Sequence, residues 1–99
     1  MGKCYEFHFQ EGFTGQTVSL AVDGETRVHF EARTRLQTGL ARIETLELNP
    51  GQTVTITVPD LALHGEYRVA GGDRYRWITI NLVDRMLVMR SAQESPGYL

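Results

Sequence analysis

Metal binding is the first chemistry to consider, because this 99-residue sequence contains three histidines and one cysteine. Histidine nitrogen and cysteine sulfur are common zinc ligands, and local sites place two ligands a few residues apart. No two of His8, His29 and His64 have such a spacing, and Cys4 is the single cysteine. A site would require His8 and His29 to converge from neighbouring strands, whereas solvated outward positions on strands explain both residues without a ligand. We therefore expect no bound metal.

Catalytic patterns are also missing from the sequence. Cys4 lies near the start of the chain with no base beside it, and no serine lies in a nucleophile-elbow sequence. The glutamates occupy positions where alternation calls for a polar outward side chain, so solvation accounts for them. The Gly71-Gly72 pair lacks the following lysine and the strand–loop–helix context of a phosphate-binding loop. We expect a protein that is not an enzyme and needs no cofactor.

The remaining candidate is the aromatic and basic stretch DRYRW, at residues 73–77. The sequence that follows, ITINL, alternates apolar and polar residues, which predicts a half-buried strand. Extended backwards, the same alternation puts Tyr75 and Trp77 on the outer face. A further aromatic residue, Tyr67, lies in the strand predicted before it. The candidate binding or interface residues are Tyr75, Trp77, Arg74, Arg76 and Tyr67.

Three interpretations of Tyr75 and Trp77 are open. In the first, the rings are structural, because tryptophan is mostly buried and a connection can fold over them. In the second, the rings contact another copy of the chain or a different protein, since Trp, Tyr and Arg are enriched in interface hot spots and open sheet edges favour self-pairing. In the third, the rings form a flat platform for a small ligand such as a sugar.

The charge of the chain bears on the class of partner. A formal net charge of −2 gives no long-range attraction to nucleic acid or to anionic membranes. The stretches RTR, at residues 33–35, and DRYRW resemble single-strand binders in their arginines, but acidic residues lie near each of them. No apolar run approaches the length of a signal or membrane-spanning segment, and a lone cysteine excludes an intramolecular disulfide. We expect a cytoplasmic protein without a nucleic-acid or membrane partner.

Strands must position all of these residues, because period-two alternation recurs along the chain. The Asp23-Gly24 dipeptide between two alternating runs is typical of a type I′ hairpin, and Asn49-Pro50-Gly51 predicts another turn. The segment 33–42 is the least regular, and we expect a loop with a short helical turn that crosses between sheets. The predicted strands lie at residues 3–9, 16–22, 25–32, 43–48, 53–58, 67–69, 73–82 and 86–90.

Strands at intervals of roughly ten residues predict an all-β, mainly antiparallel β-sandwich of seven or eight strands, immunoglobulin-like or jelly-roll-like, with a small closed β-barrel as the alternative. We expect a single domain over residues 1–99, with an irregular tail over residues 92–99. The predicted core comprises Phe7, Val18, Leu20, Val22, Val28, Phe30, Leu46, Leu48, Val54, Ile56, Val58, Ile78, Ile80 and Leu82.

The predicted function is a non-catalytic binding or assembly module that acts through protein–protein contacts, as a homo-oligomer or with another protein. The alternative is a small-ligand or carbohydrate-binding domain that uses Tyr75 and Trp77 as an aromatic platform. A solution mass and a ligand titration separate these two functions. A sandwich fold alone does not, because sandwiches carry many unrelated functions.

Overall fold

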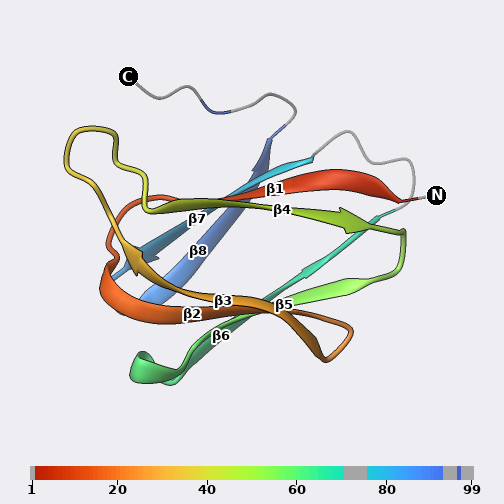
Figure 1. The fold of residues 1–99 in the computed structure, drawn as a ribbon, viewed down its shortest axis with the longest axis horizontal. Coiled ribbons are helices and arrows are strands. Elements are labelled where there is room, and N and C mark those ends of the chain that lie inside the picture. Colours follow the sequence, from red (N-terminus) through yellow and green to blue (C-terminus); the bar gives the residue numbers. More distant parts are fainter. Residues whose placement is uncertain (1, 71–75, 93–95, 97–99) are drawn as a thin grey trace.

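The computed structural model describes residues 2–70, 76–92 and 96, and these residues form two four-stranded sheets that do not close into a barrel (Figure 1). This arrangement confirms the predicted β-sandwich. A three-residue 3-10 helix, η1 (Pro59–Leu61), is the one helical element among the described residues. The strands are β1 (Lys3–Phe9), β2 (Thr14–Val22), β3 (Glu25–Arg33), β4 (Arg42–Leu48), β5 (Thr53–Val58), β6 (Leu63–Arg68), β7 (Trp77–Val83) and β8 (Met86–Ala92).

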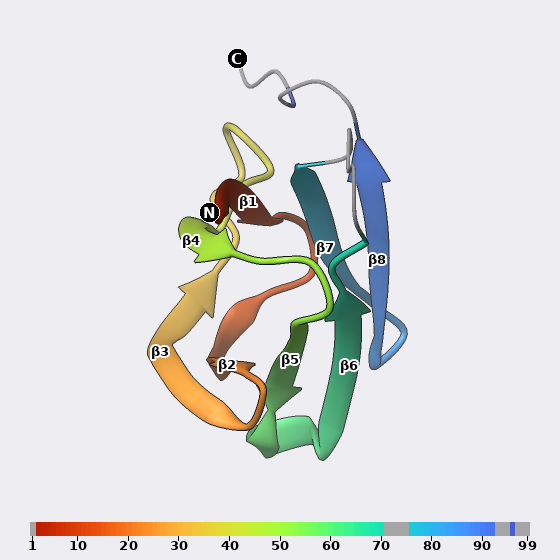
Figure 2. The ribbon, with the colours of Figure 1, turned by 90° about the vertical axis from the view of Figure 1, so that its right-hand side faces the viewer.

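The order of the strands decides which of them lie at the edges. One sheet has the order β4-β1-β7-β8 and the other has the order β3-β2-β5-β6. The described pairings are antiparallel except for the parallel pairing of β1 with β7. Figure 2 shows β3 and β4 on one side of the sandwich and β6 and β8 on the other. Each of these two sides is therefore formed by a pair of edge strands.

The predicted turns form, although one of them connects strands that are not neighbours. Asp23 and Gly24 have φ values of 49° and 85°, as a type I′ hairpin requires. The turn at residues 49–51 joins β4 of one sheet to β5 of the other. The segment 33–42 crosses between the sheets as predicted. In place of the expected short helical turn it contains a tight turn at residues 36–39, which an antiparallel bridge between Arg35 and Leu40 closes and in which the Gly39 amide donates to the Arg35 carbonyl at 2.8 Å.

The hydrophobic core lies between the two sheets. Every predicted core residue is buried except Val28 and Leu46, which are partly buried and pack against the core. The additional buried apolar residues are Tyr5, Phe9, Phe13, Ala32 and Val69. Phe9 packs edge-on against Phe13 and Phe30, with centroid separations of 5.9 and 5.1 Å. Both sheets thus contribute aromatic rings to one continuous core.

Candidate functional site at the β7–β8 ribbon

Two of the predicted interface residues, Arg76 and Trp77, lie next to each other at the start of β7. Two others, Arg74 and Tyr75, lie outside the described residues. Trp77 is half-buried, and its register with Glu6 places it on the outer face of the β4-β1-β7-β8 sheet. The central carbon of the Arg76 guanidinium lies 5.9 Å from the centroid of the Trp77 ring. This separation is near the outer limit of a cation–π contact. Arg76 and Trp77 therefore form one surface.

The fifth predicted residue, Tyr67, lies elsewhere. Its register partner on β5 is Val54, which is fully buried, so Tyr67 points between the sheets. Its ring centroid is 6.4 Å from that of Tyr5 and 6.1 Å from that of Phe7. Tyr67 is thus a partly buried neighbour of the core and does not share a face with Trp77.

The histidines do not converge as a metal site would require. His8 lies on β1 and His29 on β3, in different sheets. Within the part of the chain that the structure describes, no three His, Cys, Asp or Glu side chains come close enough together to hold a metal ion. No helix in the described residues is long and apolar enough to cross a membrane.

The prediction that His8 is a solvated residue is wrong. His8 is on the outer face of its sheet, as its alternation indicates, but only 1% of its surface is exposed. The cause is its position in an interior strand, where Ile43 on β4 and Thr79 on β7 flank it. Its Nε2 and the Oε1 of Glu6 are 2.8 Å apart, so the buried ring has a hydrogen-bonding partner in the carboxylate. Alternation predicts which face a side chain occupies but not how deeply it is covered.

The β7–β8 ribbon, which comprises the two strands and their turn, carries two of the four large apolar side chains that are exposed among the described residues. The other two are Leu36, in the segment 33–42, and Ile43, on β4. Val83 is 48% exposed and Met86 is 64% exposed, and the two face each other across the ribbon. Val88 lies next to them on the same outer face and is half-buried. We call Val83, Met86 and Val88 the outer strip. The strip leaves apolar surface in contact with water at a free sheet edge.

The edge strand β8 differs from the other edge strands in its chemistry. Strands β3, β4 and β6 each carry at least two charged side chains, whereas β8 carries Arg90 alone. Four consecutive apolar residues begin β8, so both of its faces are apolar there. Charged side chains are a common means of preventing edge strands from pairing with another chain. The β8 edge lacks this protection over most of its length.

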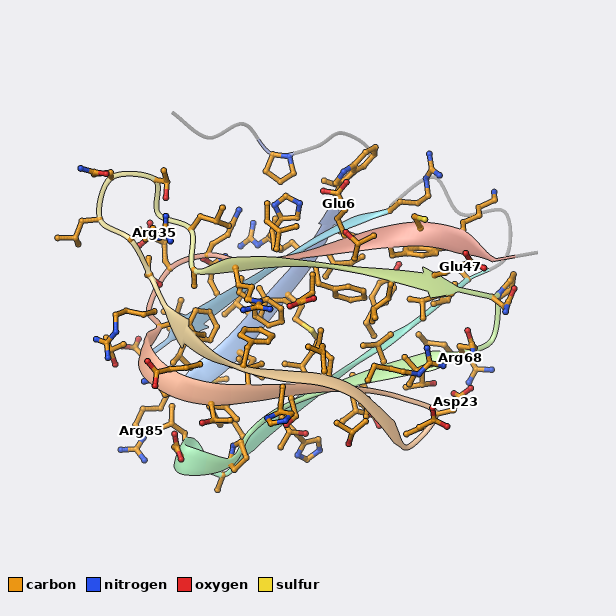
Figure 3. The ribbon with its side chains drawn as sticks, in the orientation of Figure 1. Glu6, Asp23, Arg35, Glu47, Arg68 and Arg85 are labelled. Carbon is orange, nitrogen blue, oxygen red and sulfur yellow. The ribbon has the colours of Figure 1, made fainter. Side chains whose placement is uncertain are left out.

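Backbone strain marks the turn of the same ribbon. Asp84 and Arg85 have φ values of 50° and 62°, in the left-handed region. Aspartate tolerates this region, but an arginine there costs roughly 1 kcal/mol relative to a relaxed backbone. Figure 3 shows Arg85 at the opposite end of the sandwich from Asp23 and Glu47. Val83 and Met86 of the outer strip directly flank this strained turn.

Comparisons with known proteins identify no relative: no protein-family model, curated protein or solved structure matches the chain. The outer strip is not among the binding residues predicted from the sequence, although a local signal for it is present. The run MLVM breaks the period-two alternation that the other strands keep, and such a run indicates a strand with apolar contacts on both faces.

Proposed function

We propose that the protein is a non-catalytic assembly module that forms a homo-oligomer through the β7–β8 ribbon. The observation that carries this proposal is the outer strip at the unprotected β8 edge. Burial of a Val or Met side chain contributes about 1.5–3 kcal/mol, so covering the strip stabilises an assembly. An exposed apolar edge strand otherwise carries a cost in solubility.

A second copy of the chain is the partner that this surface fits best. Two identical edge strands are complementary when they run antiparallel, because each presents the same row of backbone donors and acceptors. Such a contact has two-fold symmetry, and two-fold dimers are the commonest oligomers of soluble proteins. The near-neutral charge of the chain, −2, opposes this association only weakly. The proposal includes a cytoplasmic location, where the exposed Cys4 thiol stays reduced.

The carbohydrate-binding alternative receives less support from the geometry. Trp77 is half-buried, and Arg76 lies beside its ring, so a sugar would have to share the exposed part of the ring with a guanidinium group. The flat, open aromatic surface that stacks on a sugar is therefore restricted at Trp77. We regard self-association as the better-supported function.

Solution mass tests the proposal. Sedimentation or light scattering from about 1 mM to about 1 nM chain covers association free energies of about −4 to −12 kcal/mol. We expect a species of twice the 11.2 kDa chain mass that dissociates on dilution. Val88→Lys places a charge on the β8 edge and should give a monomer at concentrations where the wild-type chain is a dimer.

The matched control is Thr45→Lys. Thr45 is exposed on β4, the opposite edge strand of the same sheet, so the same charge is added away from the outer strip. We expect this variant to dimerise like the wild-type chain. Equal loss of association in both variants, or a wild-type monomer at every concentration, contradicts the proposal.

A further inference from the structure

The turn of the ribbon determines which backbone groups of β8 face its free edge. The two-residue turn at Asp84 and Arg85 makes Val83 and Met86 a hydrogen-bonded pair. In an antiparallel ladder, hydrogen-bonded and non-hydrogen-bonded pairs alternate. Met86 and every second residue after it in β8 therefore point their backbone N–H and C=O groups toward β7. The residues between them point these groups away from β7. These residues are Leu87, Met89 and Ser91.

This pattern selects one register for pairing β8 with a second copy of itself. In an antiparallel pair centred on Met89, Leu87 lies opposite the partner's Ser91, and Met89 lies opposite the partner's Met89. All three outward-pointing residues then form hydrogen-bonded pairs, and the full length of the strand is used. Centres at Val88 or Arg90 leave part of β8 beyond the end of the partner strand.

The same register places Met86 of one copy next to Trp77 of the other copy. Within one chain, Trp77 lies opposite Ala92 on the outer face, and Val83 lies opposite Met86. Across the Met89-centred pair, Ala92 lies opposite the partner's Met86. Neighbouring strands are about 4.8 Å apart, and the small Ala92 side chain leaves the space above it to its larger neighbours. The Trp77 ring and the partner's Met86 side chain can therefore meet over Ala92.

We infer that two copies of the chain pair β8 with β8 about a two-fold axis at Met89, forming one continuous eight-stranded sheet in which Met86 of each copy packs against Trp77 of the other. This inference rests on the proposed homo-oligomer and specifies its contact. It accounts for three features together: the apolar run in β8, the exposure of Met86 and the position of Trp77 beside a small residue. It also protects the two otherwise open edges, because each β8 edge covers the other.

Disulfide cross-linking through an engineered cysteine tests the register of the β8–β8 pair. In a Cys4→Ser background, Met89→Cys puts two thiols opposite each other across the axis, at a Cα separation of about 5.5 Å, which a disulfide spans. Leu87→Cys and Ser91→Cys are matched controls on the same face of the same strand. Each of them lies about 13 Å along the strand from its own copy, beyond the reach of a disulfide. With an added oxidant that takes up the two electrons of the thiol pair, we expect a disulfide-linked dimer from Met89→Cys alone.

Tryptophan fluorescence gives a second readout that does not depend on a substitution in the strand interior. Trp77 is the single tryptophan, so its emission has one source. We expect the emission to shift to longer wavelength as the dimer dissociates on dilution. Met86→Ser, at an exposed position, should raise the dimer dissociation constant at least about tenfold without lowering the melting temperature of the monomer.

The outcomes separate this inference from the proposed function. A dilution-dependent dimer that is not linked through Met89→Cys, or is linked equally through all three positions, overturns the β8 pairing and leaves the homo-oligomer intact. A dimer whose Trp77 emission is unchanged on dilution overturns the contact between Met86 and Trp77. A monomer at every concentration overturns both the inference and the function on which it rests.

Discussion

The guanidinium group of Arg42 lies over the ring of Phe30, with its central carbon 4.7 Å from the ring centroid. Arg42 begins β4 in one sheet and Phe30 lies in β3 of the other, so this contact joins the two sheets along one side of the sandwich. The Arg42 Nε also donates to Glu44 Oε1 at 2.6 Å, which orients the guanidinium. This side is thus covered by a charged residue, in contrast to the apolar β8 edge on the other side.

Replacing Arg42 with alanine should lower the free energy of unfolding by about 1 kcal/mol, because the variant loses both the cation–π contact and the aliphatic cover of Phe30. Urea denaturation followed by circular dichroism measures the change. Glu44→Gln is the control, since its amide oxygen still accepts the hydrogen bond from Arg42. An Arg42→Ala variant as stable as the wild-type chain would show that the contact is incidental.

The pair formed by Glu6 and His8 gives a second prediction. Glu6→Ala removes a carboxylate that accepts a hydrogen bond from a buried ring, and we expect a loss of about 1–2 kcal/mol in stability. Glu6→Gln keeps an acceptor oxygen at the same position and should lose less. Chemical denaturation of the two variants side by side makes the comparison. Equal losses would mean that the acceptor is not what stabilises His8.

Two glycines with nearly the same φ value should respond very differently to replacement by alanine. Gly12 and Gly51 have φ values of 92° and 91°. A Cβ at Gly12 would collide with the carbonyl group of Leu82, whereas a Cβ at Gly51 meets nothing within 4 Å. Both variants incur a left-handed backbone cost of about 1 kcal/mol. Gly12→Ala must also displace β7, so we expect it to be destabilised by at least about 2 kcal/mol more. Thermal melts that rank the two variants equally would contradict this account.

Relief of strain in the β7–β8 turn gives a further prediction. Arg85→Gly creates at residues 84–85 the same Asp-Gly dipeptide that forms the β2–β3 turn at Asp23. Because glycine adopts positive φ without a steric cost, we expect the free energy of unfolding to rise by about 0.5–1 kcal/mol. Arg85→Ala keeps the strain and should show no such gain. The measurement is made at chain concentrations below the dissociation constant of the proposed dimer, so that it reports the stability of the monomer.

The sequence by itself determined most of the strands, their turns and the face that each side chain occupies. The exception is β6, which was expected at residues 67–69 and spans Leu63–Arg68. Side chains of an extended chain alternate between faces, so Val18, Leu20 and Val22 had to point one way wherever β2 lies. The Asp23-Gly24 turn was equally local, because its backbone conformation depends on those two residues. Local signals of this kind were sufficient to predict a sandwich, and to place Trp77 on an outer face.

Only the tertiary structure decided which strands are neighbours and which lie at an edge. Every strand offers the same backbone donors and acceptors, so pairing depends on contacts between distant segments that no local pattern records. His8 is buried because β1 is an interior strand, and Tyr67 is separated from Trp77 because β6 and β7 belong to different sheets. The exposure of Met86 has the same origin: β8 is last in its sheet, and no other strand in the described residues covers its far edge.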